Sequence, residues 1–464
     1  MRLNWHELNG ARADSADGTV VEIHGFPATV LPSVHATHFI LTFEPGCCPG
    51  CFPRDRAASV EVFAASPIPT RGQQLRLSGR WRVQRDDAEG WRYQLHGARL
   101  LEPPGWRSVS RRGVLAAGPL MCLAACSGGP SSPQQQADAR RAIQAAATVD
   151  IHSHAGSIAS TNHIRNGGPF GAVARPMQQG GMAAICLAVV SDGPTHRVMA
   201  DGRIHPYRKP DPGELYQFGQ LAFGRVHDLA RDQGLAVITD VAGLRAARAG
   251  TASAIISAEG ADFLEGQVDR VDEAYAKWGL RHLQLTHYRV NELGDIQTEP
   301  PVHGGLTDVG AEVIRRCNRL GIVVDVAHGT YDLVVRAASV TSKPLVLSHT
   351  SLSLLPAPYS RRISREHARV VAKTGGVVGV WPPAEEFPTL TSMAAGMARM
   401  VDAVGIDHVG LGSDMRGLVG PSILPDYDRL PGLAEALIGV GFSVPDTSKI
   451  LGGNYARVFE TCMV

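Results

Sequence analysis

The chain has 464 residues, a length that predicts two to four domains or one large barrel with an appended domain. Lys and Arg total 45 against 44 for Asp and Glu, and this balance removes any global charge argument for nucleic acid or an anionic membrane surface as the partner. A composition that is 44% hydrophobic and 19% charged excludes collagen-like, disordered and multi-span membrane chains. Eight cysteines are too few for a disulfide scaffold, so the 18 histidines are the more informative count.

Residues 1–104 form a predicted small domain with five short β-rich runs. The runs cover residues 20–25, 38–43, 59–63, 74–83 and 92–101. Five such strands predict a small all-β barrel of the oligonucleotide-binding (OB) type. The segments VEIHGF, FILTFEPGCCPGCFP and VEVFA are also similar to a small bacterial domain of unknown function.

Three cysteines, Cys47, Cys48 and Cys51, crowd one loop of this domain. Cys48 and Cys51 have the spacing of a redox or metal-binding pair, but no βαβ pattern surrounds them, which argues against thioredoxin-like chemistry. A metal or disulfide role and an ordinary turn that carries thiols both remain open from the sequence.

Residues 105–141 contain a segment that differs from both of its neighbours. The pair Arg111 and Arg112 precedes an apolar run at 113–125, which ends at Cys126 and a polar Ser/Gly/Pro/Gln linker. The segment resembles a twin-arginine export signal, and its last residues, Leu-Ala-Ala-Cys, resemble the box at which bacterial lipoprotein signals are cut and lipidated. About 14 apolar residues are too few for a comfortable membrane span.

This signal-like segment implies an exported protein, periplasmic or anchored to a membrane by a lipid on Cys126. The alternative is an ordinary buried helix in a cytoplasmic protein. An export signal belongs at an N-terminus, yet 109 residues precede this one. Either the start of the protein is therefore assigned too far upstream, or two separate coding units are fused.

Eight short apolar runs alternate with amphipathic helical patterns between residues 142 and 464. The runs cover residues 147–151, 183–190, 254–257, 283–286, 322–326, 345–347, 376–380 and 408–411. Eight strands in strict alternation with helices over about 320 residues predict an α/β fold, a (β/α)8 TIM barrel. The predicted domains are therefore a β domain at 1–104, the signal-like segment and linker at 105–141, and the barrel at 142–464.

Metal-ligating residues follow most of the predicted barrel strands, at the end where this fold builds its active sites. The residues in these positions are His152 and His154, Glu259, His287, His328, His349 and Asp414. One such histidine alone is more often an ordinary polar residue, but six strand ends in the same register are improbable by chance. Imidazole and carboxylate groups suit zinc or a similar divalent ion.

Two metal sites follow from the positions of these residues. The two-residue period of a strand turns His152 and His154 to the same side, where they would hold one ion. His328 and His349 would hold a second ion, and Glu259 could bridge both ions with its two oxygens. Asp325 alternates to the other face of its strand and is predicted to be structural support.

Several long motifs then match one family in order and spacing. They are LQLTHYRVNELGD (283–295), GGLTDVGAEVIRRCNRLGIVVDVAHGTYD (304–332), PLVLSHTS (344–351), DHVGLGSDMRG (407–417) and GGNYARVFE (452–460). From about Val149 to Glu460 the chain resembles the membrane (renal-type) dipeptidase family of the amidohydrolase superfamily. This resemblance implies a two-zinc enzyme that hydrolyses dipeptides through a metal-bridging hydroxide, and it suggests homodimers.

The same resemblance assigns roles to individual residues. It gives His152, His154 and Glu259 to one zinc, and Glu259, His328 and His349 to the other. His287 would hold the scissile carbonyl, Asp414 would carry the proton, and Arg362 would clamp the substrate carboxylate, with Arg361 as the substitute because the register is uncertain by one. Well-known animal members have Asp at the position of His154, so the charge of the ligands at the first metal site is one unit more positive here.

Two other functions remain open from the sequence. The same metal pair could serve another amidohydrolase reaction, such as hydrolysis of a lactone, a cyclic amide or an N-acyl amino acid. A non-catalytic binding lipoprotein would use the barrel only as a scaffold, but that hypothesis leaves the metal-ligating residues without a purpose.

Overall fold

The computed structural model describes most of the chain. The described residues are Met1, Leu3, Trp5, Leu8, 11–28, 35–42, 59–69, 75–84, 92–101, 131–145, 147–248, 250–353, 356 and 358–464. The chain divides into two compact units, Met1–Leu120 and Met121–Val464. The cysteine loop and the signal-like segment through Cys126 lie outside the described residues. Within the described residues, no helix has the length and apolar character needed to cross a membrane.

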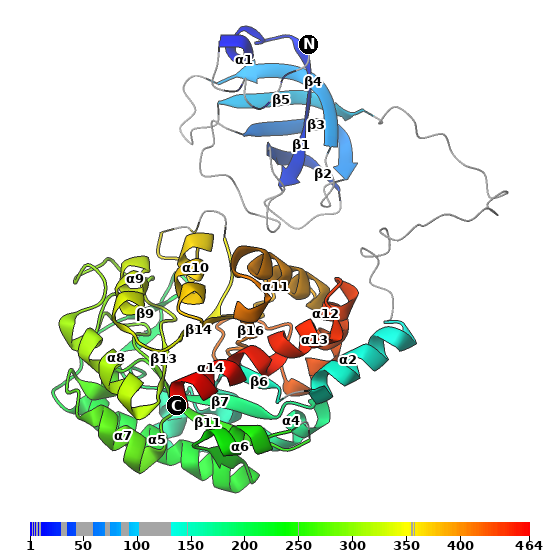
Figure 1. Cartoon of the computed structure of the whole chain (residues 1–464). Coiled ribbons are helices and arrows are strands. Elements are labelled where there is room, and N and C mark those ends of the chain that lie inside the picture. Colours follow the sequence, from blue (N-terminus) through cyan, green and yellow to red (C-terminus); the bar gives the residue numbers. More distant parts are fainter. Residues whose placement is uncertain are drawn as a thin grey trace. The chain divides into compact units, whose positions relative to one another are not determined.

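The first unit is a closed five-stranded barrel (Figure 1). Its strands are β1 (Val20–Ala28), β2 (His35–Thr42), β3 (Val60–Pro69), β4 (Leu75–Val83) and β5 (Tyr93–Leu100), in the order β1-β2-β3-β5-β4. β3 and β5 pair in parallel, and the other described strand pairs of this barrel are antiparallel. Inward residues such as Leu77 and Trp81 are buried, while Arg80 and Arg82, on either side of Trp81, are exposed. The predicted OB-like barrel is confirmed, with one short unpredicted helix, α1 (Ala11–Ser15).

The second unit contains an eight-stranded parallel barrel whose sheet has one extra strand, and a separate two-stranded sheet. The barrel strands are β6 (Val149–Ser153), β7 (Ala184–Val190), β11 (Ser253–Glu259), β12 (His282–Gln284), β13 (Val323–Asp325), β14 (Leu345–Thr350), β15 (Val377–Val380) and β16 (Val409–Leu411). Each strand pairs with the next along the chain, and β6 pairs with β16, which closes the ring. The unpredicted strand β10 (Ala236–Ile238) pairs with the first half of β11.

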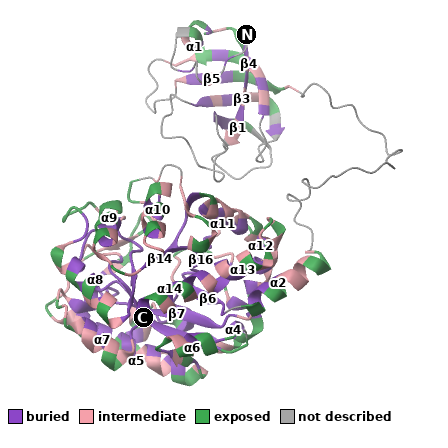
Figure 2. Cartoon of the chain, in the orientation of Figure 1, coloured by how far each residue is buried: buried purple, intermediate pink, exposed green. Residues whose placement is uncertain are grey.

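Helices surround these strands and cover their outer side (Figure 1). They are α3 (Thr161–Asn166), α4 (Ala174–Gly180), α5 (Glu214–Gln233), α6 (Val241–Ala246), α7 (Arg270–Trp278), α8 (Asp308–Leu320), α9 (Tyr331–Val340), α10 (Arg365–Lys373), α11 (Leu390–Val404), α12 (Leu430–Gly439), α13 (Val444–Ser448) and α14 (Asn454–Met463). The strands are buried on both faces, and the helices are buried only where they face them (Figure 2). This arrangement confirms the predicted TIM barrel.

Helix α8 illustrates why these sequences form helices at these positions. Its N-cap, Thr307, accepts a hydrogen bond from the backbone N–H of Gly310, and Gly321 ends the helix with a φ of 76° that suits glycine. Between these caps, Ala311, Ile314 and other residues of one face are buried against the barrel. The capping residues and the extent of the buried apolar face therefore agree on where the helix begins and ends.

Helix α2 (Pro133–Ala145) differs from the sequence prediction, which places most of it in the linker. Its buried residues are Ala139, Ala142 and Ile143, and it packs against α12 and α13. The described part of the barrel unit therefore includes a helix ahead of residue 142. Its glutamine-rich start is polar, as a linker is. Its apolar residues are buried by helices that are distant in sequence, so the sequence alone does not show that this segment packs against the barrel.

Two glycines allow β15 and β16 to approach the backbone of β14. A Cβ atom added to Gly412 would lie 1.7 Å from the carbonyl oxygen of Ser348, and one added to Gly379 would lie 1.8 Å from the same atom. We expect Gly412→Ala to lower the unfolding free energy of the barrel by about 1–3 kcal/mol, the usual cost of overpacking. Thermal unfolding followed by circular dichroism measures the loss.

The control for this prediction is Gly224→Ala in α5, where an added Cβ would meet no atom within 4 Å. Alanine is favoured over glycine inside a helix, so this variant should unfold at the same temperature as the wild type or slightly above it. Equal unfolding temperatures for the two variants would contradict the close approach at Ser348.

Candidate metal centre

The end of β6 brings two histidines together inside the barrel mouth. His152 and His154 are both buried, and their Nε2 atoms lie 3.1 Å apart. On the far side of its ring, the Nδ1 of His154 donates to the carbonyl oxygen of Ala188 at 2.8 Å. The two side chains therefore lie together, as the strand period predicts.

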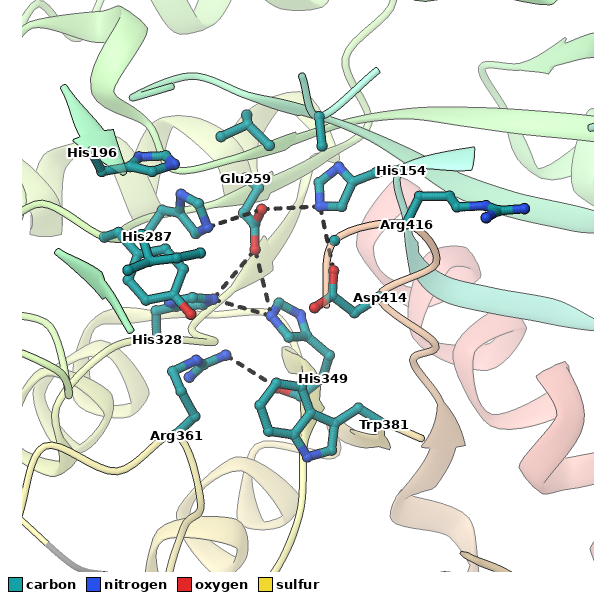
Figure 3. A pocket seen from close by; sticks show the side chains of 15 residues that line it. His154, His196, Glu259, His287, His328, His349, Arg361, Trp381, Asp414 and Arg416 are labelled. Carbon is teal, nitrogen blue, oxygen red and sulfur yellow. Dashed lines mark hydrogen bonds and ion pairs between the residues drawn. The ribbon is translucent and has the colours of Figure 1, made fainter. Parts of the chain in front are cut away.

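Glu259, at the end of β11, lies at the centre of the site (Figure 3). Its Oε1 lies 3.3 Å from the Nε2 atoms of His152 and His328 and 3.5 Å from that of His349. Its Oε2 lies 3.1 Å from the Nε2 of His154 and 3.2 Å from that of His287. One buried carboxylate thus contacts five imidazoles from four other strand ends.

Burial and mutual charge determine the protonation of this cluster when no metal is present. Burial opposes ionisation of Glu259, but the neighbouring histidines outweigh it and hold the pKa of the carboxyl well below its usual range. Burial likewise disfavours the charged form of His152, yet Glu259 raises the pKa of that imidazole to about 9. Burial lowers the pKa of His328 and of His349 well below the usual value, so both rings are neutral.

The arrangement of hydrogens fits a bound cation. Because Nδ1 of His154 donates to a carbonyl, its Nε2 can present a lone pair to a cation. This atom lies 3.1 Å from Oε2 of Glu259 and 3.5 Å from Oδ1 of Asp414. The neutral rings of His328 and His349 also point their Nε2 atoms at each other, 3.1 Å apart. Lone pairs and carboxylate oxygens that converge in a buried space are the donor set of a divalent metal.

The donor atoms are also close enough to share ions. In the described residues, several groups of three side chains have ligand atoms within 4.8 Å of one another. One group is His152, His154 and Asp414, a second is His152, Glu259 and His349, and a third is Glu259, His287 and His328. Two of these sets share Glu259 and two share His152, as expected for ligands of neighbouring ions.

Next to the cluster is a cavity of about 160 Å³. Figure 3 labels His287, Arg361, Trp381 and Asp414 in its lining. Tyr288 lines it as well. Several of these residues also line an adjoining outer cavity of about 500 Å³. The metal-ligand cluster therefore lies at the inner end of a pocket large enough for a small molecule.

The structure places the two candidate arginines differently. Arg361 lines the cavity, donates to Oε1 of Gln297 at 2.7 Å, and lies over the ring of Trp381. Arg362 points elsewhere, and its Nε lies 3.4 Å from Oε2 of Glu386. The two neighbouring side chains face different ways, so a difference of one residue in register decides which arginine reaches the pocket.

Asp414 follows β16, and its side chain reaches the same cavity. Its φ of 48° and the φ of 67° at His328 are left-handed values that non-glycine residues seldom adopt. Burial, reinforced by the charge of Glu259, raises the pKa of Asp414 to about 6. Unusual backbone conformations at two residues of one cluster are typical of functional sites.

Two buried aspartates link the strand ends beneath the cluster. Asp325 accepts hydrogen bonds from the backbone N–H groups of Ala327 and Ser348, and it does not line the cavity. Asp150, which the sequence analysis did not single out, accepts one from the N–H of Ser413 at 2.8 Å. Both carboxylates therefore fix the segments that carry the ligand residues.

The sequence analysis missed several residues that lie in or beside the pocket, namely Asp192, His196, Tyr288 and Trp381. Asp192 follows strand β7 by two residues and Trp381 follows β15 directly, and these are the two strand ends to which no role was given. The rule that found the metal ligands, inspection of the residues after each strand, would have found these two.

The comparison with protein families decides the classification. The model of the membrane dipeptidase family, peptidase family M19, matches residues 217–463. The chain belongs to this family. The family predicted from the sequence motifs is thereby confirmed.

Curated dipeptidases are similar to part of this chain. The chain is 32% identical to dipeptidase aclJ of Aspergillus oryzae over 218 residues, which are 45% of this chain and 51% of that protein. It is 29% identical to dipeptidase tcpJ of Claviceps purpurea over 227 residues, 47% of this chain and 52% of that protein. The chain thus spans about half the length of these curated relatives.

Solved structures confirm the barrel of this family. An amidohydrolase from Pseudomonas aeruginosa has a TM-score of 0.56 at 21% identity, over 70% of this chain and 99% of that one. A metallopeptidase from Rhodobacter sphaeroides, bound to a phosphinate mimic of the dipeptide L-Ala-D-Ala, has a TM-score of 0.55 at 21% identity. The match covers 68% of this chain and 99% of that one. At such identities the likeness shows the fold.

Proposed function

We propose that this member of the family is a metal-dependent dipeptidase that works with two divalent ions, most simply zinc. The observation that carries the proposal is the position of Glu259, whose two oxygens contact five buried imidazoles. His152 and His154 would hold one ion with Glu259, and His328 and His349 would hold the other with it. Imidazole and carboxylate donors in a closed pocket suit zinc.

The residues around the ions have separate tasks in this proposal. When bound, two divalent cations supply Lewis-acid polarisation and a water acidic enough to attack at neutral pH. His287 orients the scissile carbonyl, and Asp414, at the rim of the pocket, accepts a proton and passes it to the leaving amine. No serine nucleophile is required.

Arg361 gives the pocket its preference for a free carboxylate. Its guanidinium lies in the wall that the inner and outer cavities share, where it can make a two-point contact with a carboxylate. A short substrate with a free C-terminus fits this arrangement better than the interior of a polypeptide. The neighbour from Rhodobacter sphaeroides holds a mimic of L-Ala-D-Ala, which supports including dipeptides with a C-terminal D-residue among the substrates.

The purified full-length chain should contain about two divalent ions per molecule and hydrolyse dipeptides. Metal content by inductively coupled plasma mass spectrometry and turnover of a panel of L,L- and L,D-dipeptides, measured on one sample, test this. N-Acylated amino acids and lactones in the same panel test the other amidohydrolase reactions. Absence of metal, together with no dipeptide turnover after zinc or manganese is added, would reject the proposal.

We further propose, from the sequence alone, that the protein is exported and carries a lipid on Cys126. The support is the twin arginine pair, the apolar run and the Leu-Ala-Ala-Cys box. Mass spectrometry of the native product should find a chain that begins at a lipidated Cys126. Recovery of the intact 464-residue chain from the cytoplasm would reject export through this segment.

A further inference from the structure

Asp192 is a buried carboxylate behind the pocket that the mechanism above does not use. We propose that Asp192 is a positioning residue, which fixes the ring of His287 so that its Nε2 is directed into the pocket. The inference rests on the proposed dipeptidase function, because it assigns a task to the partner of a substrate-binding histidine.

The contacts of Asp192 leave His287 one orientation. Oδ1 of Asp192 lies 2.7 Å from Nδ1 of His287, and Oδ2 accepts the backbone N–H of Tyr288 at 3.0 Å. A carboxylate has no hydrogen to donate, so Nδ1 of His287 carries the proton that joins them. Nε2, on the other side of the ring, is then directed at the site, 3.2 Å from Oε2 of Glu259.

The same carboxylate also reaches the hairpin formed by β8 (His196–Val198) and β9 (Ile204–Pro206). Nδ1 of His196 lies 3.2 Å from Oδ1 of Asp192, and the rings of His196 and His287 meet edge to face. His196 and Ile204, one from each strand of the hairpin, line the inner cavity, and Figure 3 labels His196. Asp192 therefore connects one wall of the pocket to the histidine that faces the substrate.

The neighbouring residue strengthens this role. Ser191 donates its backbone N–H to the carbonyl oxygen of Glu259 at 3.1 Å and its hydroxyl to that of Gly260 at 2.6 Å. The end of β7 thus fixes two neighbouring segments, the one that carries the central carboxylate and the one that carries His287. A shift of either would misalign the reacting groups, since catalysis is sensitive to displacements of about 1 Å.

An asparagine at position 192 cannot replace these contacts. The carboxylate accepts from His287 and from the N–H of Tyr288, whereas an amide has one acceptor oxygen and an NH2 group that would face a donor. We expect Asp192→Asn to lower kcat by about 10–100-fold, the usual effect of losing such a partner, with little change in KM. The exposed Asp211→Asn, on the segment that leads into α5, is the control and should keep wild-type kinetics.

A double-mutant cycle separates positioning from a general structural effect. If Asp192 acts through His287, then Asp192→Asn should cost little further activity in a His287→Gln background. A purely structural role would lower kcat by the same factor in both backgrounds. Equal, multiplicative losses in the cycle would therefore overturn the proposal.

A second readout does not require turnover. In the full-length chain labelled with 15N-histidine, the His287 ring signals, assigned by their loss in His287→Gln, should show a proton on Nδ1. In Asp192→Asn these signals should move toward those of a ring with mixed tautomers, and unchanged signals would overturn the proposal. A wild-type chain that hydrolyses no dipeptide would reject the proposed function, and these spectra would still decide the role of Asp192.

Discussion

Glu259→Gln is expected to lose nearly all dipeptidase activity and most of the bound metal. The amide has one acceptor oxygen, lacks the negative charge, and would direct an NH2 group at ring nitrogens that now contact a carboxylate. Removing one partner from a buried group of charges costs about 3–5 kcal/mol, and an equal loss of transition-state stabilisation corresponds to about 150–5,000-fold in kcat/KM. Steady-state kinetics and metal content on the same preparation measure both effects.

The matched control is Glu265→Gln, on the loop that follows the same strand. Glu265 pairs with Arg270 at 2.8 Å and does not line the pocket, so this variant should keep its metal and nearly wild-type activity. If Glu259→Gln instead kept two ions and near-normal turnover, a bridging carboxylate at this position would be ruled out.

Arg361→Gln is expected to have the second largest effect. Loss of one member of a buried charge-assisted contact costs about 2–5 kcal/mol, equivalent to about 30–5,000-fold in kcat/KM for a dipeptide with a free carboxylate. The loss should appear mainly in KM, because the carboxylate is bound in both the ground state and the transition state. A dipeptide amide, which lacks this carboxylate, should be hydrolysed slowly and equally by both enzymes.

Arg362→Gln is the neighbouring control, because that side chain faces Glu386 and does not line the pocket. A partly exposed ion pair is worth about 0–1 kcal/mol, so kcat/KM should change by less than about five-fold. A larger loss in Arg362→Gln than in Arg361→Gln would reverse the assignment of the carboxylate clamp.

The architecture of both barrels could be predicted because local patterns and tertiary structure agree. A run such as Ala184–Val190 is continuously apolar because parallel barrel strands are buried on both faces. The cluster around Glu259 could be predicted because every barrel strand ends at the same rim, so residues distant in sequence must meet there. Strand β10 was missed because only three residues pair along half of a neighbouring strand.

The direction of Arg361 could not be predicted, since it depends on a contact distant in sequence. The hydroxyl of Thr350 donates to the carbonyl oxygen of Arg361 at 2.8 Å, and the N–H of Ile363 donates to the carbonyl of Ser351 at 3.0 Å. These bonds set the register of an irregular segment against β14. Helix α2 was missed for a related reason, since its apolar face is covered by helices from the other end of the chain.

The central claim is that Glu259 joins two divalent ions, and anomalous X-ray diffraction at the zinc edge tests it most directly. Crystals of the full-length chain grown with zinc should show two anomalous peaks beside this carboxylate. One peak should lie next to His152 and His154 and the other next to His328 and His349, each about 2.0–2.1 Å from the ring nitrogens. A map with no peak at Glu259, or with zinc bound only elsewhere, would contradict the account.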